Sequence, residues 1–180
     1  MLRSVTAVAL FWLASACAWA APSPANDAYW DSYFSIWANN ATASPQAVEK
    51  FYASRVSYYG HEMTPPEVYQ DKLYLIRRWP VRSYHVVPGS VATVCGDNHD
   101  SCQVTLVMDF WSANPALGVG VQGETTVSLS LIREGDDMKI DRENGVPLLR
   151  SSCKLMGPDW RQKSSWRCSP VHPATPDLVS

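Results

Sequence analysis

His61 is the residue of this 180-residue sequence best suited to proton transfer, because imidazole titrates near neutral pH. It follows Gly60 and a tyrosine, Tyr59, whose phenol can assist such a step or meet a ligand. Tyr33 and Trp37 are spaced one helical turn apart and add a second phenol and an indole. We expect Tyr33, Trp37, Tyr59 and His61 to line a pocket, with His61 as the candidate catalytic group. The alternative is that His61-Glu62-Met63 forms a surface loop.

Other titratable residues are expected to be structural. Asp109 alternates with core residues along a strand, so it should face away from the pocket. The sequence has no Gly-x-Ser-x-Gly, no His-Glu-x-x-His, no phosphate loop and no dinucleotide fingerprint. We therefore expect no cofactor and no metal site.

Cysteine usage indicates an oxidising compartment. One of the five cysteines, Cys17, lies in an apolar leader, which leaves an even number in the rest of the chain. Four cysteines allow three pairings, and we favour Cys95 with Cys102 and Cys153 with Cys168 because each pair brackets a short loop. Neither pair has the close spacing that is usual for zinc.

The leader itself is typical of a signal peptide. Arg3 precedes an apolar run from Val5 to Ala18, and Ala18-Trp19-Ala20 offers a small-x-small cleavage site. We expect residues 1–20 to be removed on export. A membrane anchor and a lipoprotein modified at Cys17 are the alternatives, but the run is short for a bilayer span and the residues before Cys17 depart from the lipoprotein pattern.

Helices are expected in the first half of the chain. Asn26-Asp27 can cap a first helix whose apolar residues recur at i, i+3, i+4 and i+7. Ser44-Pro45 starts a short second helix, and the capping box Thr64-Pro65-Pro66-Glu67 starts a third that ends at Trp79-Pro80.

A period of two then predicts strands. Alternation is clearest from Cys102 to Trp111, where Leu106 and its alternate neighbours face the core and Val107 faces outward. Further strands are expected at 55–59, 83–87, 91–95 and 121–133 and from 138 onward, with the pair 83–87 and 91–95 forming one strand interrupted at Pro88-Gly89.

This order of elements, together with the segment FYASRVSYYG at 51–60 and a helix ending in Arg78-Trp79-Pro80, resembles the nuclear transport factor 2-like (SnoaL-like) superfamily. The resemblance covers residues 27–146. It implies a cone-shaped α+β fold, with three N-terminal helices packed on a curved antiparallel sheet and a ligand site inside the cone. The superfamily includes isomerases, dehydratases, polyketide cyclases, secretion-system subunits and proteins without chemistry. The strand at 55–59 lacks the acidic base that some of its enzymes carry, which favours a non-catalytic role.

The function that we expect is an exported binding or accessory module of the periplasm or cell envelope, whose cone pocket takes a small apolar or aromatic ligand. One alternative is a small lyase or isomerase that uses His61 with a pocket tyrosine. Another is an envelope-assembly or secretion-system subunit, or a homodimer, that docks through the outer sheet face around Val107 and Trp111.

Charge divides the chain into unlike parts, although the net charge is only −2. Residues 21–149, the expected domain, hold nine basic and fifteen acidic side chains, whereas residues 150–180 hold five basic and two acidic ones. We expect this C-terminal extension, with Trp160 and Trp166, to meet an anionic envelope surface or a protein, or else to pack on the domain. The acidic domain argues against nucleic acid as a partner.

Overall fold

The computed structural model describes residues 26–171. The expected signal peptide at 1–20 and the alternative anchor at Cys17 lie outside the described residues. Within 26–171, no helix combines the length and the apolar character needed to cross a bilayer.

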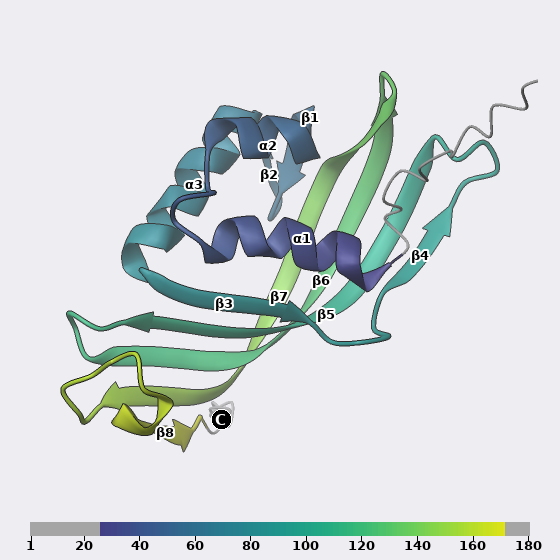
Figure 1. The fold of residues 1–180 in the computed structure, drawn as a ribbon. Helices are drawn as coiled ribbons and strands as arrows, with labels where there is room; N and C mark the ends of the chain where they lie inside the picture. The colour runs from purple at the N-terminus through teal and green to yellow at the C-terminus, as the bar shows by residue number, and fades with distance from the viewer. Residues whose placement is uncertain (1–25, 172–180) are drawn as a thin grey trace, which may run out of the picture.

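Three helices lie over one face of a large curved sheet (Figure 1). The elements are α1 (Asp27–Ala38), α2 (Pro45–Phe51), β1 (Tyr52–Tyr58), β2 (His61–Met63), α3 (Pro65–Arg78), β3 (Val81–Val86), β4 (Ala92–Cys95), β5 (Ser101–Asn114), β6 (Val119–Glu134), β7 (Asp137–Leu155), a 3₁₀ turn (Lys163–Ser165) and β8 (Trp166–Pro170).

The helices begin at the caps that the sequence predicts. The side chain of Asn26 accepts a hydrogen bond from the Tyr29 amide at 2.8 Å, and Ser44 does the same for Ala47 at 3.2 Å. At α3 the Glu67 carboxylate accepts from both the amide and the hydroxyl of Thr64. Each cap satisfies amides that have no partner within the helix, which fixes where the helix starts.

The sheet is mixed, with strand order β2-β1-β7-β6-β5-β3, while β4 pairs with β5 and β8 with β7. The expectation of an antiparallel sheet is wrong at one place, because β1 runs parallel to β7. A tight turn between two strands predicts that they are antiparallel. β1 and β7 are far apart in the chain and meet only in the folded molecule, so the sequence gives no such signal for this pair. As expected, β3 and β4 act as one interrupted strand, since both pair with β5.

Two irregularities in β7 decide which of its side chains face the helices. Opposite β6, Ser130 pairs with Arg142 and Leu131 pairs with Ile140, so Asp141 is an extra, bulged residue. Ile140 and Glu143 are therefore both buried, although they are an odd number of residues apart. A second shift, between Gln122 and Gly123 of β6, reverses the alternation again near Arg150.

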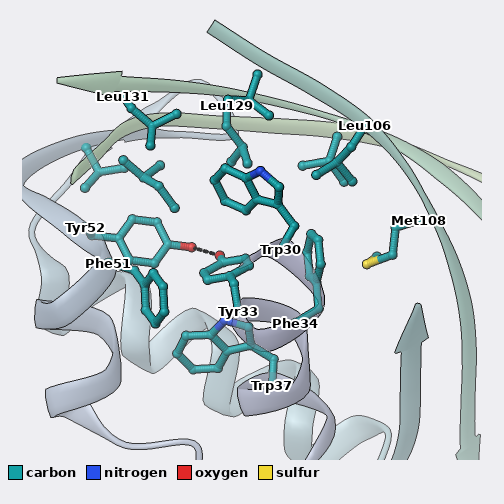
Figure 2. Packing of buried hydrophobic residues seen from close by; sticks show 14 of the residues in the cluster. Trp30, Tyr33, Phe34, Trp37, Phe51, Tyr52, Leu106, Met108, Leu129 and Leu131 are labelled. Carbon is teal, nitrogen blue, oxygen red and sulfur yellow. Dashed lines mark hydrogen bonds between the residues drawn. The ribbon is translucent and has the colours of Figure 1, made fainter. Parts of the chain in front are cut away.

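The core lies between α1 and the concave face of β5, β6 and β7. Figure 2 shows Trp30 of α1 beside Leu129 of β6 and Tyr33 directed at Tyr52. Trp30 and Tyr33 are fully buried, and so are Leu106 and Leu129. This confirms the expected inward faces of both the helix and the strands.

The C-terminal segment continues the sheet. The boundary expected between residues 149 and 150 falls inside β7, which is continuous to Leu155 and then pairs with β8. Trp166 packs edge-on against Trp111, with ring centroids 5.3 Å apart. Residues 150–171 are thus joined to the outer face of the sheet through both backbone and side chains.

Both cysteine pairings that the sequence favours are present. Cys95 bonds to Cys102, and Cys153 bonds to Cys168. In each case the two residues stand directly opposite each other in an antiparallel ladder, so the disulfides link β4 to β5 and β7 to β8.

Candidate functional site

A cavity of about 560 Å³ lies between the helices and the concave face of the sheet. Helix α3 forms one wall, and α1 and β7 contribute others. Half of its apolar lining residues are aromatic: Phe34, Trp37, Tyr58, Tyr59, Trp79, Tyr84 and Phe110. A volume of this size suits a small organic molecule.

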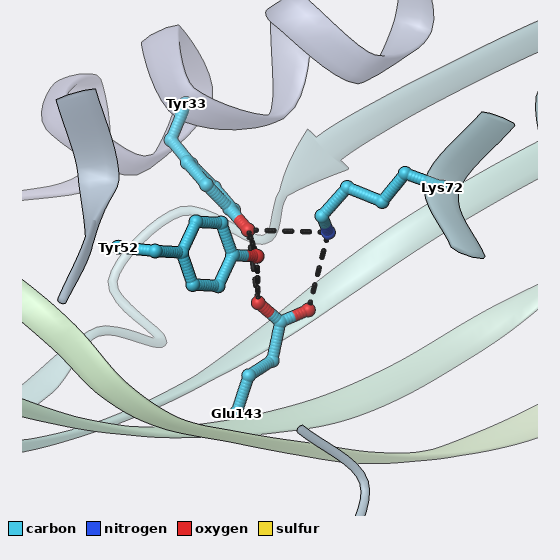
Figure 3. A network of polar contacts seen from close by, with 4 residues as sticks. All are labelled: Tyr33, Tyr52, Lys72 and Glu143. Atoms are coloured by element: carbon cyan, nitrogen blue, oxygen red, sulfur yellow. Dashed lines mark hydrogen bonds and ion pairs between the residues drawn. The ribbon is translucent and has the colours of Figure 1, made fainter. Parts of the chain in front are cut away.

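One wall of the cavity carries a buried polar network (Figure 3). The Glu143 Oε2 atom accepts hydrogen bonds from the phenols of Tyr33, at 2.9 Å, and Tyr52. Its Oε1 atom lies 3.5 Å from Lys72 Nζ. Glu143 is 5% exposed, so the carboxylate is removed from water and satisfied by protein donors. The four residues come from α1, the start of β1, α3 and β7.

Aromatic rings surround the Lys72 ammonium. Its Nζ lies 4.7 Å from the ring centroid of Trp37 and 5.3 Å from that of Tyr58, and the rings of Tyr52 and Tyr33 follow at 5.5 and 5.8 Å. The faces of these rings attract a cation, and Glu143 supplies the opposite charge. Lys72 is therefore held between one carboxylate and four aromatic rings.

The two network phenols remain protonated. Burial raises the pKa of Tyr33 and Tyr52 well above the usual tyrosine value, and the negative charge of Glu143 raises it further. Each phenol is held as a hydrogen-bond donor, which is the role that Glu143 needs from it.

A second polar group, Arg82 on β3, lies elsewhere on the cavity wall. Its guanidinium donates to the carbonyls of Trp37, Ile76 and Trp79 and to the side chain of Asn40. These carbonyls belong to the C-terminal ends of α1 and α3, where the helix dipole is negative. Arg82 thus fixes the ends of two helices relative to the sheet.

The structure separates the four residues that the sequence assigned to a pocket. Trp37 and Tyr59 do line the cavity, although the Tyr59 side chain is also 47% exposed. Tyr33 does not line it, because its phenol is bonded to Tyr52 and Glu143. His61 is exposed on β2 and lies outside the cavity lining, since the hairpin with β1 turns it towards solvent.

Sequence reasoning missed Glu143, Lys72 and Arg82. Strict alternation from Ile140 puts Glu143 on the outer face, and only the bulge at Asp141 turns it inward. Lys72 follows the helical stripe of α3, where a buried lysine is uncommon. No signal in the sequence identifies this pair of buried opposite charges, because the two residues come together only once the strands are placed.

The outer sheet face differs from the open patch that the sequence suggested. Trp111 is half-buried beneath Trp166, and Val107 is also half-buried, beside Ser90. Asp109 is exposed, as expected. Docking through this face stays a prediction. Among residues 26–171, no three His, Cys, Asp or Glu side chains are grouped so as to hold a metal ion.

Comparisons with known proteins identify the fold but give no closer relative. No family model matches the chain, and neither does any curated protein. Bd1075 of Bdellovibrio bacteriovorus superposes with a TM-score of 0.52 and 16% identity, over 67% of this chain but only 40% of its own length. A candidate dehydratase of the nuclear transport factor 2-like family from Streptomyces avermitilis gives 0.54 and 12%, over 68% of this chain and 95% of its own. A hexachlorocyclohexane dehydrochlorinase from Novosphingobium barchaimii gives 0.53 and 11%, over 68% and 84%. With its three helices on a curved mixed sheet, the chain has the cone-shaped nuclear transport factor 2-like fold.

Proposed function

We propose that the protein is an exported binding module that holds a small, largely apolar or aromatic molecule in its cone pocket. The observation that carries this proposal is the cavity of about 560 Å³ with a mainly apolar lining, half of it aromatic. Ligand sites of proteins are typically concave, apolar and of this size, with a few polar groups that orient the ligand.

The state of the polar groups favours binding over catalysis. Two structural neighbours bear the names of elimination enzymes, a dehydratase and a dehydrochlorinase, and elimination needs a base that is free to take a proton. Here both oxygens of Glu143 already face donors of the protein. His61, the base of the lyase or isomerase alternative, lies outside the lining.

Two features support export. The apolar leader at 1–20 has a cleavage pattern, and the two disulfides indicate an oxidising environment. Native mass spectrometry of the protein from an exporting host tests this directly. We expect a mass that corresponds to cleavage after Ala20 with both disulfides formed. An intact leader, or lipid attached to Cys17, contradicts the proposal as stated.

Binding is tested at the rim of the pocket, where β7 offers a matched pair of leucines. Leu149 lines the cavity and is 43% exposed, whereas Leu148 points the other way and is 66% exposed. A Leu149→Trp variant places a large ring in the cavity, while Leu148→Trp places the same ring in solvent. Neither change removes a core residue.

The probe is the neutral fluorophore N-phenyl-1-naphthylamine, titrated into the wild type and both variants. We expect Leu149→Trp to weaken binding by at least about tenfold, a free-energy change of about 1.4 kcal/mol, and Leu148→Trp to leave it unchanged. Equal affinities in all three proteins, or no binding to the wild type, contradict a ligand-binding pocket. Circular dichroism confirms that the variants are folded.

A further inference from the structure

Arg82 is a buried cation without an acidic partner among residues 26–171. The residue is only 7% exposed, and its four side-chain hydrogen bonds go to three carbonyl groups and to Asn40. The ion pairs of the described residues involve other cations. A buried charge without a counter-charge is unfavourable, and the helix-terminal carbonyls offset it only in part.

One guanidinium N–H remains unused. The Nε–H is directed to Trp37 O, both hydrogens of Nη1 have acceptors at Ile76 and Trp79, and Nη2 donates to Asn40. A guanidinium has five N–H groups, so one on Nη2 has no acceptor in the described part of the chain. Arg82 is one of the residues that line the cavity, so its side chain is part of the wall that a ligand would contact.

The sheet neighbours of Arg82 in the cavity lining carry hydroxyl groups, whereas the acids of the lining, Asp71 and Glu143, lie on α3 and β7. Ser112 is directly opposite Arg82 in the β3–β5 ladder, and Tyr84 follows on the same face; both line the cavity. The indole Nε1 of Trp37, whose own carbonyl receives Arg82, is buried and has no hydrogen-bond partner within residues 26–171. Trp37, which has a buried indole N–H without a partner, is thus in contact with Arg82, which has one N–H without a partner.

Of the other two cations in the lining, Arg78 and Lys72, Lys72 differs in this respect. Lys72 faces Glu143 and four aromatic rings, so its charge is already balanced. A ligand carboxylate placed against Lys72 would meet the negative charge of Glu143. The same carboxylate placed against Arg82 would meet a cation that has no ion-pair partner among residues 26–171.

We propose that the cone pocket selects ligands that carry a carboxylate, which binds at Arg82 while the apolar body of the ligand covers the aromatic wall. This inference rests on the ligand-binding function proposed above. It names a chemical class, an aromatic or alicyclic monocarboxylate, that an apolar pocket alone would not distinguish from a neutral analogue.

The test compares two probes of equal shape, 2-naphthoate and 2-naphthamide, by isothermal titration calorimetry at pH 7.5. Charge-assisted hydrogen bonds are about twice as strong as neutral ones, so we expect naphthoate to bind at least about tenfold more tightly. Arg82→Gln should bring the two affinities within about twofold of each other. Arg77→Gln is the matched control, because Arg77 is exposed on α3 outside the cavity lining.

A second variant keeps the test valid if Arg82→Gln does not fold. Trp37→Phe removes the unpartnered indole N–H but keeps an aromatic ring, and it should reduce the preference for naphthoate by about threefold or more. Equal affinity of the wild type for the two probes overturns the inference and leaves the binding function standing. Equal loss of preference in Arg77→Gln also overturns it, because the effect would then be one of net charge. If neither probe nor the neutral fluorophore binds, both proposals fail.

Discussion

Glu143 is held by donors from three different elements: Tyr33 on α1, Tyr52 at the start of β1 and Lys72 on α3. Because one carboxylate joins all three to β7, the network positions the helices over the sheet as well as satisfying buried charge. An ion pair of this kind adds little stability compared with an apolar replacement, but removing one partner alone is costly.

Removing either charge should therefore destabilise the fold strongly, and removing both should do so less than additively. We expect Glu143→Gln and Lys72→Met each to lower the free energy of unfolding by about 3–5 kcal/mol, since each leaves a buried charge unpaired. The double variant should lose less than the sum by at least about 1 kcal/mol. Urea denaturation measures all three. Strictly additive losses would show that the pair is not coupled.

The network also predicts a loss of stability in alkali. The pKa of Tyr33 and Tyr52 is raised in the folded state, by burial first and then by Glu143, so their contribution is complete below the unfolded value near 10. Above that pH the unfolded chain loses protons that the folded chain keeps. Each phenol should then reduce the free energy of unfolding by up to about 1.4 kcal/mol per pH unit.

Urea midpoints between pH 8 and pH 11 measure this slope. Tyr52→Phe should make the decline above pH 10 shallower by up to about one proton equivalent. Tyr74→Phe, an exposed tyrosine of α3, should leave the slope unchanged. If both variants decline as steeply as the wild type, the buried phenols are not the cause.

At the scale of elements, the parts that local chemistry determines were predictable and the long-range parts were not. Caps at Asn26, Ser44 and Thr64 set the starts of the helices, and alternation along β5 and β6 identified their buried faces. The parallel contact of β1 with β7 and the bulge at Asp141 depend on residues that meet only after folding. Because Glu143 depends on that bulge, the pocket wall was predicted only in its aromatic part, at Trp37 and Tyr59.

Strand β8 should depend on its disulfide more than on its own packing. Its residues are mostly exposed, apart from the contact of Trp166 with Trp111. Replacing Cys153 and Cys168 by alanine reopens a loop with a sequence separation of 15, for which the chain-entropy cost is about 3 kcal/mol. We expect amides of β8 to exchange faster with deuterium while those of β6 keep their protection.

The matched control replaces Cys95 and Cys102, which join β4 to β5 and lie away from β8. That variant should leave exchange in β8 as it is in the wild type. Faster exchange throughout the sheet in the first variant would instead mean that β8 unfolds together with the core.

Residues 26–171 form one sheet over one core, and the basic residues 150–171 belong to that sheet. β7 pairs with β6 on both sides of residue 149, and Trp166 covers Trp111 from beyond β7. The unlike charges of residues 26–149 and 150–171 therefore lie on a single body. An anionic partner for residues 150–180 stays a prediction, and its binding would not require a separately folded unit.

A chain that ends at residue 149 should accordingly be less stable than one that ends at residue 171. The truncation removes the ladder between β6 and residues 151–154 of β7 and uncovers Trp111. We expect a lower urea midpoint and concentration-dependent aggregation, because an apolar strand surface and an open edge are exposed. Equal midpoints and a monomeric elution profile for both chains would support two independent units.

The bulge at Asp141 sets the face of the sheet on which the following side chains of β7 lie. Without the bulge, Asp141 would take an ordinary place in the strand, and the side chains from Arg142 to the second shift near Arg150 would change face: Arg142 would point towards the helices and Glu143 towards solvent. Lys72 would then meet a positive charge in place of its counter-ion. The chemistry of this pocket wall is consequently set by one extra residue in β7 as much as by residue identity, and a relative of this chain that lacks that residue should keep the acid inward on a regular, unbulged strand.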